Sequence, residues 1–347
     1  ERGERDEAHD LYKRAETAYS AAGDSTRVAH ILATRSSLRR YEGQYDTAMD
    51  YCRQALALVE GTTNRDKAAM ALAHRNLGLC QLRVGQLAEG RTALDIALTL
   101  YEAVDSPYDV GLVYHDLGLS HELVGDLPAA VEDYRAALRR WRRLGNLAPW
   151  ANTLNGLGVV YYRQADYDRA LATLTEAREK AQQAGDLRVV AYTWASVGVV
   201  PSDLGAYELA RQVYTQAHDV AVSAQVGFIV TYALDALGNT LRLQGNLLSA
   251  RGKLREAMRH AREYGSDYEI GLCHTSLGIL AGEEGLLEEA RQRLDESIDL
   301  FESGGFEREL ARSWFHLAHV SFMDQDDAAA LSHLERALEI VVPLGLE

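Results

Sequence analysis

Apolar residues recur three or four positions apart along most of the chain. Residues 127–138 show the pattern clearly, with apolar side chains at Leu127, Ala130, Val131, Tyr134, Ala137 and Leu138. In an α-helix that spacing gathers the apolar side chains on one buried face. The pattern therefore predicts an all-α fold built from amphipathic helices.

The pattern repeats every 40 residues. A Leu-Gly pair returns at 77–78, 117–118, 157–158, 237–238 and 277–278, and Val197-Gly198 and Leu317-Ala318 keep the same register. Two columns of small residues share this phase, one through 130, 170 and 210 and the other through 137, 177 and 217. Small side chains let helix backbones approach closely. We expect the glycines to lie inside each helix pair and the alanines to lie against the next pair.

A turn stands between the Leu-Gly pair and the first alanine column. It holds glycine at positions 43, 85, 125, 205, 245 and 285, and Ala165 in the remaining unit. Glycine supplies the left-handed conformation that ends a helix, so each unit is predicted to be helix, turn, helix. Counted from the turns, the helix pairs are expected at 24–60, 66–103, 107–144, 147–184, 187–224, 227–264, 267–304 and 307–343.

These columns resemble the tetratricopeptide repeat, whose first helix carries Trp-x-x-Leu-Gly-x-x-Tyr. Trp194 and Trp314 occupy the Trp position, and Tyr161 occupies the Tyr position. The 40-residue period is longer than the usual repeat of roughly 34. Such long repeats resemble those of Pins-type polarity adaptors, bacterial Rap-type peptide-sensing regulators, and the sensor arms of maltose-regulator-type and AfsR-type signalling ATPases. The resemblance implies a right-handed all-α solenoid of antiparallel helix pairs, about eight and a half units over residues 1–347.

Some segments depart from the regular unit. Residues 3–15 have the pattern of a second helix without its first, and residues 340–344 are apolar where a terminal repeat needs a polar outer face. We therefore expect a piece of a longer protein. Residues 61–64 lengthen one connection by two residues, an insertion that a solenoid tolerates. Pro201 lies inside a first helix and is expected to kink it or end it early.

Composition narrows the class of function. The chain has 51 acidic and 36 basic side chains and a formal charge of −15, which opposes binding of a nucleic-acid backbone by the whole surface. Cys52, Cys80 and Cys273 are widely spaced, which fits a reducing compartment and excludes a thiolate zinc site. No apolar run approaches the roughly 20 residues of a membrane-spanning helix. We expect a cytoplasmic protein that binds neither nucleic acid nor membrane. The excess of arginine over lysine is typical of a GC-rich bacterial genome.

No catalytic or cofactor motif emerges from the repeat. The glycines follow the 40-residue period and form no phosphate-binding loop, and no two histidines have zinc-site spacing. His74 and His274 share the column of Trp194, so we expect packed structural histidines. The sequence predicts a chain without metal, cofactor or enzymatic activity of its own.

One basic cluster stands out in this acidic chain. Five arginines surround Trp141, namely Arg135, Arg139, Arg140, Arg142 and Arg143. One interpretation is a helix C-terminus, whose dipole favours cations, ahead of Gly145. The other is a docking patch for an acidic partner or phosphate that uses arginine forks and a partly exposed Trp141. Both interpretations stay open at the level of the sequence.

The architecture itself predicts a broader binding surface, because the first helices of stacked pairs line the concave face of the superhelix. In the resembled family ligands lie there. An asparagine just before Leu-Gly, as at Asn76, resembles the family's asparagine that grips a peptide backbone, and arginines in the groove are expected to meet carboxylates. The alternative is a merely solvated helix face. The predicted groove residues are Arg75, Asn76, Arg83, His115, Asn152, Asn155, Tyr162, Arg163, Tyr192, Tyr232, Asp235, Asn239 and Arg242.

The leading hypothesis is a non-catalytic scaffold that captures a protein or peptide segment in this groove. We expect it to be the sensor or interaction arm of a bacterial signalling or transcription regulator, in which ligand binding shifts the arm between states. Two alternatives are a constitutive assembly adaptor and the substrate-recruiting region of an enzyme whose catalytic domain lies outside this chain.

Overall fold

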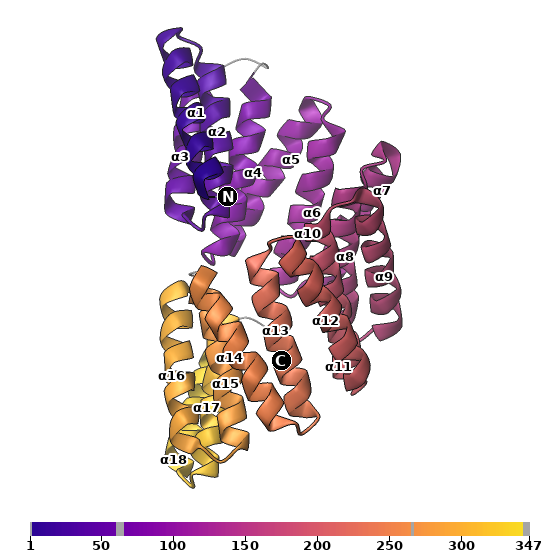
Figure 1. Ribbon diagram of the computed structural model, residues 1–347. Helices are drawn as coiled ribbons and strands as arrows, with labels where there is room; N and C mark the ends of the chain where they lie inside the picture. Colours follow the sequence, from indigo (N-terminus) through magenta and orange to yellow (C-terminus); the bar gives the residue numbers. More distant parts are fainter. Residues whose placement is uncertain (1, 60–65, 265–266, 343–347) are drawn as a thin grey trace. The chain divides into compact units, whose positions relative to one another are not determined.

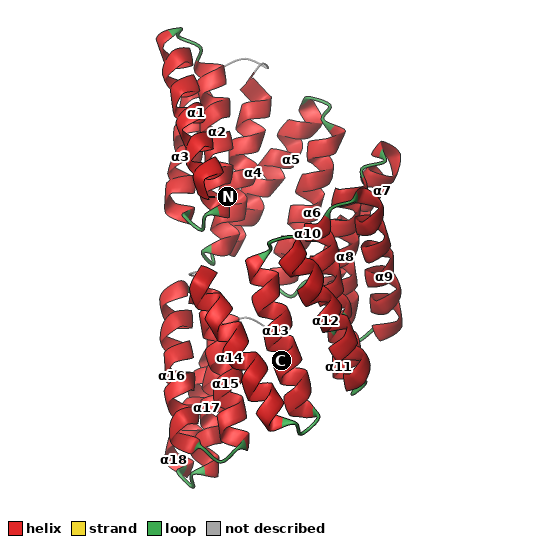
Figure 2. Ribbon diagram, viewed as in Figure 1, coloured by secondary structure: helices red, strands yellow, loops and turns green. Residues whose placement is uncertain are grey.

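The computed structural model describes residues 2–59, 66–264 and 267–342, and this part of the chain contains helices and turns without a β-strand (Figures 1 and 2). It forms two compact units, Glu1–Gly145 and Asn146–Glu347. In the described part no helix is long and apolar enough to cross a membrane. The predicted all-α class is confirmed.

The first unit contains a leading helix and three helix pairs. Its helices are α1 (Arg2–Ala21), α2 (Ser25–Tyr41), α3 (Tyr45–Val59), α4 (Lys67–Arg83), α5 (Leu87–Ala103), α6 (Pro107–Leu123) and α7 (Leu127–Leu144). Helix α1 packs on α2, and α3 and α5 each pack on the first helix of the next pair, as second helices of a solenoid do. The predicted insertion at 61–64 lies outside the described residues.

The second unit contains five helix pairs in the same arrangement. Its helices are α8 (Leu147–Arg163), α9 (Tyr167–Ala184), α10 (Leu187–Val197), α11 (Val199–Asp203), α12 (Tyr207–Ser223), α13 (Gly227–Leu243), α14 (Leu247–Tyr264), α15 (Asp267–Glu283), α16 (Leu287–Gly304), α17 (Glu307–Met323) and α18 (Asp327–Val341). The first helix that contains Pro201 is divided into α10 and α11, which confirms the predicted irregularity. Of the apolar C-terminal run, residues 343 and 344 lie outside the described residues.

The turns have the predicted left-handed conformation. Gly125 has φ 81°, and Ala165 adopts φ 57° even though it carries a Cβ. The next residue begins the following helix: the Asp126 and Asp166 carboxylates accept hydrogen bonds from backbone N–H groups three residues on, each at 3.1 Å. A C-cap followed at once by an N-cap satisfies the free backbone groups of both helix ends within a very short turn.

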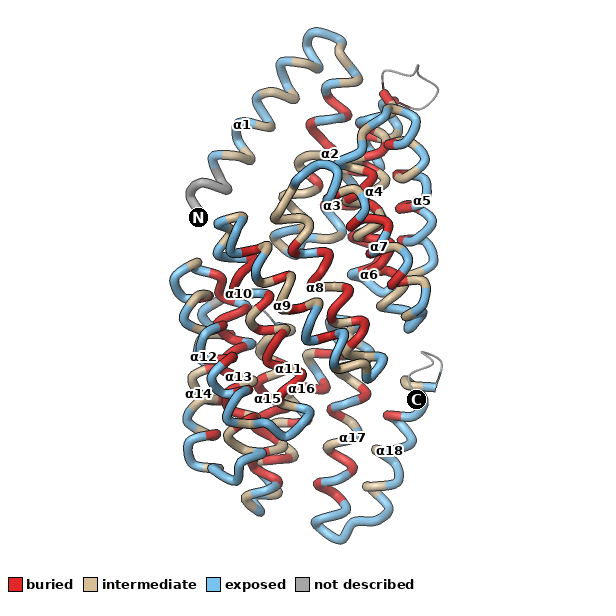
Figure 3. The backbone as a smooth tube through the Cα atoms, turned by 90° about the vertical axis from the view of Figure 1, so that its right-hand side faces the viewer, coloured by how far each residue is buried: buried red, intermediate tan, exposed pale blue. Residues whose placement is uncertain are grey.

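The glycines bring the two helices of each pair together as predicted. The first alanine column lies in this same contact and not against the next pair, since a Cβ on Gly278 would lie 3.2 Å from the carbonyl oxygen of Ala290. A Cβ added to Gly158 would lie 2.6 Å from Cγ of Leu174 in the same pair, and one on Gly198 would lie 2.5 Å from Cε1 of Tyr214. The alanine columns are closed to solvent, with Ala170 and Ala177 at zero exposure. In Figure 3 the buried residues run as stripes along the helices while the turns are exposed. Close backbone approach therefore organises each pair.

Two glycines of the second unit test this packing. Gly238→Ala places a Cβ 2.6 Å from the buried Leu254 side chain, whereas a Cβ on exposed Gly252 of α14 meets nothing within 4 Å. We expect Gly238→Ala to lower the free energy of unfolding by about 1–3 kcal/mol through overpacking. We expect Gly252→Ala to raise it by about 0.5–1 kcal/mol through helix propensity. Urea unfolding of both variants measures the difference, and a destabilised Gly252→Ala or a neutral Gly238→Ala would contradict it.

Candidate functional site

The first helices of the second unit form one continuous face. Helices α8, α10, α13, α15 and α17 contact one another directly in series, whereas the second helices pack mainly on first helices rather than on each other. Helices that lie closer on one side curve a stack toward that side. This first-helix face is therefore the concave side of the second unit, where the sequence places a groove.

Several predicted groove residues of this unit link neighbouring first helices. Tyr162 on α8 donates its hydroxyl to Oδ2 of Asp203 on α11 at 2.5 Å. Asn239 on α13 donates to Oγ of Ser276 on α15 at 3.0 Å. Arg242 on α13 forms an ion pair with Glu283 on α15. These three side chains thus fasten one helix pair to the next.

The same links occur in the first unit and correct two predictions. Asn76 is 1% exposed, and its Nδ2 donates to the carbonyl of Ala33 and to Oγ of Ser37, each at 2.8 Å. Nε of Arg75 lies 2.5 Å from Oδ2 of Asp116. The prediction that Asn76 grips a ligand backbone is wrong, and so is the prediction that Arg75 is available to a ligand carboxylate. Both side chains reach a neighbouring helix pair before they reach solvent.

The other predicted polar residues differ in their access to solvent. Arg83 and Asn152 are exposed, and His115 and Arg163 are half-buried. Asn155 is 3% exposed, and its Oδ1 finds no hydrogen-bond donor in the described part of the chain. A buried amide oxygen without a donor is costly. Asn155 is therefore a packed polar side chain of α8 and not part of its solvated surface.

Exposed aromatic side chains line part of the first-helix face. Tyr192 on α10 is 44% exposed and Tyr232 on α13 is 41% exposed. The Tyr192 ring lies 6.3 Å from that of Phe228, and the Tyr232 ring lies 6.4 Å from that of Tyr214. Phe315 on α17 is more than half exposed. Large aromatic surfaces left in water mark positions where a partner side chain can pack.

A group of polar side chains on α13 and α17, which we name the α13–α17 site, lies on the same face. It consists of Tyr232, Asp235, Asn239, Arg312 and His316. Oδ2 of Asp235 accepts from Nδ2 of Asn239 at 3.0 Å, while its Oδ1 is buried without a donor among the described residues. Arg312 is exposed, and in the described structure no carboxylate oxygen lies within 4 Å of its guanidinium. The site thus holds an acceptor and a cation that lack full partners.

The charge states of the groups in the α13–α17 site depend on their burial and on the charge of Arg312. Burial raises the pKa of Asp235 to about 6, against the opposing effects of the Ser276 hydroxyl and the Arg312 charge. Burial, and then the charge of Arg312, lowers the pKa of His316 to about 4. At neutral pH the site therefore presents a carboxylate, a guanidinium and a neutral imidazole.

Arg312 and His316 are not among the predicted groove residues, although the repeat register contains them. Arg312 stands five residues before Leu317, as Tyr232 stands five residues before Leu237. The same arithmetic that selected Tyr232 selects Arg312, once the Leu317-Ala318 pair is treated like the Leu-Gly pairs.

The basic cluster on α7 fits a helix C-terminus. Arg142 and Arg143 lie in the last turn, and Gly145 ends the helix with φ 72°. Trp141 is fully buried, and a Cβ on Gly111 would lie 2.6 Å from its ring. The hypothesis of a partly exposed Trp141 is therefore wrong. Beside the cluster, Glu102 and Asp105 line a cavity of about 340 Å³ together with Arg139, Arg140 and Arg143.

The two histidines of the Trp column are packed side chains, as predicted. His274 is 4% exposed, with Nδ1 2.8 Å from Oε2 of Glu296, and burial lowers the pKa of His74. The described residues contain no cluster of three or more His, Cys, Asp or Glu that is arranged to hold a metal ion.

The raised pKa of Asp235 predicts a pH-dependent stability. The folded-state pKa of about 6 exceeds the unfolded value of about 3.9. Below pH about 4 the carboxyl is protonated in both states and does not change the free energy of unfolding. As the pH rises toward 6 the unfolded state loses its proton first, so the free energy of unfolding falls. We expect Asp235→Asn to raise the Tm at pH 7, with a gain that shrinks between pH 6 and 4. Thermal unfolding across this range tests it against Asp299→Asn, an exposed carboxylate on α16. A gain that is largest at pH 4 would contradict the assignment.

Comparison with known proteins agrees with the stacked helix pairs of the structure. Residues 68–143 and 150–221 match the tetratricopeptide repeat family. A curated relative, the transcriptional activator NprA of Geobacillus stearothermophilus, is 24% identical over 177 residues, which cover 50% of this chain and 42% of that protein. The chain thus spans less than half the length of the relative.

Solved structures share the fold at low identity. A Rap protein complexed with competence and sporulation factor superposes with a TM-score of 0.75 at 14% identity, over 99% of this chain and 94% of that one. The Rap conjugation gene regulator of plasmid pLS20 with the Phr* peptide gives 0.67 at 12% identity, over 98% and 94%. Aspartyl phosphate phosphatase F from Bacillus subtilis gives 0.68 at 10% identity, over 97% and 93%. The chain thus carries tetratricopeptide repeats at residues 68–143 and 150–221, and it shares the helical fold of these solved proteins.

Proposed function

We propose that the first-helix face of the second unit binds an extended polypeptide segment, and that the α13–α17 site is the centre of binding. The observation that carries this proposal is the unpaired state of two charged groups. Asp235 and Arg312 are close enough for the charge of Arg312 to lower the pKa of Asp235, yet no ion pair joins them in the described structure. A ligand that reaches this site would therefore pair with a carboxylate and a guanidinium that no ion pair neutralises.

A polypeptide suits this arrangement because its backbone alternates donors and acceptors. Oδ1 of Asp235 accepts from a backbone N–H or an amine, and the Arg312 fork donates two hydrogen bonds to a carbonyl or a carboxylate. Tyr192 and Tyr232 offer rigid aromatic surface for apolar side chains at small entropic cost. Charged hydrogen bonds give the segment its orientation, and the rings add apolar burial.

The comparisons support this direction. Two of the structures that share the fold are described as complexes, one with competence and sporulation factor and one with the Phr* peptide. The curated relative is a transcriptional activator longer than the matched segment. We propose that this chain is the non-catalytic sensor arm of a larger cytoplasmic bacterial regulator. A segment that bridges α13 and α17 favours one curvature of the stack and so biases the attached domains.

A second candidate is a constitutive adaptor that holds its peptide without switching. The side-chain links between neighbouring first helices favour it, because the Tyr162–Asp203, Asn239–Ser276 and Arg242–Glu283 contacts resist a change of curvature. X-ray scattering with and without saturating peptide separates the two functions, since only the sensor changes its profile.

Peptides selected on the intact chain from a random displayed heptapeptide library test the site. We expect Arg312→Ala and Tyr192→Ala each to weaken binding of the selected peptide roughly 5- to 30-fold, the loss typical of a central charged or aromatic contact. Fluorescence anisotropy with the labelled peptide measures it. As controls, Arg336→Ala on α18 and Leu248→Ala on α14 remove an exposed arginine and an exposed large apolar side chain from second helices. Equal binding by all four variants would contradict the proposed site.

A further inference from the structure

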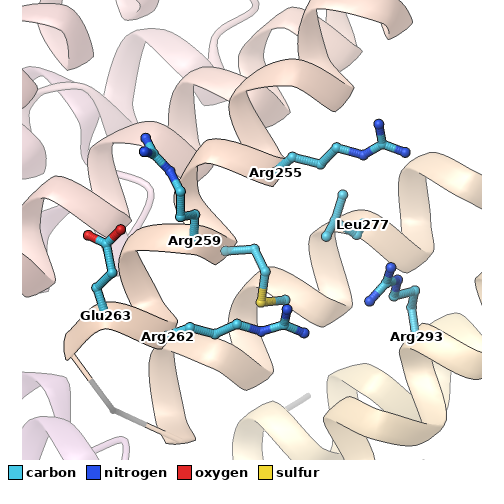
Figure 4. Close-up of a pocket in the computed structure, with 7 residues that line it drawn as sticks. Arg255, Arg259, Arg262, Glu263, Leu277 and Arg293 are labelled. Atoms are coloured by element: carbon cyan, nitrogen blue, oxygen red, sulfur yellow. The ribbon is translucent and has the colours of Figure 1, made fainter.

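A second charged surface of the second unit is centred on the second helices α14 and α16. A cavity of about 460 Å³ is lined there by residues of α14, α15 and α16 (Figure 4). Three arginines of α14, at positions 255, 259 and 262, follow each other at the spacing of one helix face, and Arg293 comes from α16. Leu277 and Met258 supply apolar lining, and Glu263 is the one acid among the lining residues.

Of the four arginines that line this arginine pocket, Arg293 forms an ion pair with Glu296 at 3.5 Å, whereas the three arginines of α14 form none in the described structure. In the described part of the chain, no carboxylate oxygen lies within 4 Å of the guanidinium of Arg255, Arg259 or Arg262. The nearby acids have other partners: Glu256 pairs with Lys253 at 2.8 Å, and Glu263 lies 3.7 Å from His260. Because the chain has a net charge of −15, its average composition does not account for three neighbouring arginines without a carboxylate partner.

Helix packing does not supply that explanation. The same three register positions hold Thr175, Glu179 and Gln182 on α9, and Asp295, Asp299 and Glu302 on α16. The repeat therefore accepts neutral or acidic side chains there. On α7 the register again holds arginines, at 135, 139 and 142, but Arg135 pairs with Glu132 at 3.0 Å, and the adjacent cavity contains Glu102 and Asp105. Of these two arginine rows, only that of α14 has no carboxylate within 4 Å.

The arrangement of the arginines selects the chemistry of the ligand. In Figure 4 the guanidinium groups of Arg255, Arg262 and Arg293 are spread around Leu277, and Arg259 points away from them. A single phosphate is best held by donors that converge on one point, whereas spread forks suit several carboxylates, each held by its own guanidinium. The apolar lining between them suits one apolar side chain.

We propose that the arginine pocket docks an acidic segment of a partner protein, in which several Asp or Glu residues surround one apolar residue. The site lies mainly on the second helices α14 and α16, with Leu277 from the first helix α15, and it uses none of the residues of the α13–α17 site. The two surfaces are therefore able to hold two segments at once, one in the groove and one outside.

The probe is a fluorescein-labelled peptide of six Asp or Glu residues around a central leucine, titrated with the intact chain at low and physiological salt. We expect micromolar binding that weakens with salt, because the contacts are between exposed charges. The triple variant Arg255→Gln, Arg259→Gln and Arg262→Gln is expected to weaken binding roughly tenfold or more. Replacing the probe's leucine by serine is expected to weaken it by a smaller factor.

The matched control removes the same three charges from α7, as Arg135→Gln, Arg139→Gln and Arg142→Gln. If this α7 variant binds the probe within twofold of the parent chain, the result supports the pocket. If both triple variants lose affinity equally, the result overturns the proposal. Absence of binding at millimolar probe, or stronger competition by inorganic phosphate or a single-stranded DNA oligonucleotide than by unlabelled peptide, also overturns it. The Arg312→Ala variant must bind this probe like the parent, which separates the outcome from that of the groove. Circular dichroism confirms that the variants are folded.

Discussion

The structure depends on the close approach of the two helices of each pair. At Gly158 and Gly238 a single added carbon would lie 2.6 Å from a leucine of the partner helix, so the backbone itself forms the contact. The first alanine column shares this contact, since a Cβ on Gly278 would lie 3.2 Å from the carbonyl oxygen of Ala290. Because these contacts return every 40 residues, one local constraint repeated along the chain sets the spacing of all the first helices in a unit. The side chains between the columns are then free to vary.

That spacing determines what the polar residues of the first helices do. Where first helices touch, a side chain of ordinary length reaches the next helix, and Asn76, Arg75, Tyr162 and Arg242 all form such links. Side-chain links of this kind strengthen contacts between neighbouring repeats, which a quasi-one-dimensional protein needs along its whole length. Asp235 is the informative exception, because one of its oxygens is buried without a donor. On this face, the polar groups that remain to bind a ligand are therefore those that are not fully paired within the stack.

The repeat itself was predictable, because the spacing of small residues is a local property of the sequence. The predicted pairs, the turns and the interruption at Pro201 all agree with the helices of the structure. The pairing of polar side chains was not predictable, since partners such as Arg75 and Asp116 are 41 residues apart and meet only through the stack. Trp141 was misjudged because its burial depends on Gly111 of the other helix. The arginines of α14 were not predicted to form a site, although they repeat the register of those on α7. Their lack of nearby carboxylates is visible only in three dimensions.

The central claim is that a polypeptide segment binds the first-helix face through groups that the stack leaves unpaired. A crystal structure of the chain with a peptide selected on it tests this claim most directly. The account predicts a peptide that contacts Tyr232, with a donor on Oδ1 of Asp235 and an acceptor on the guanidinium of Arg312. A peptide bound only to second helices, with Asp235 and Arg312 untouched, would contradict it.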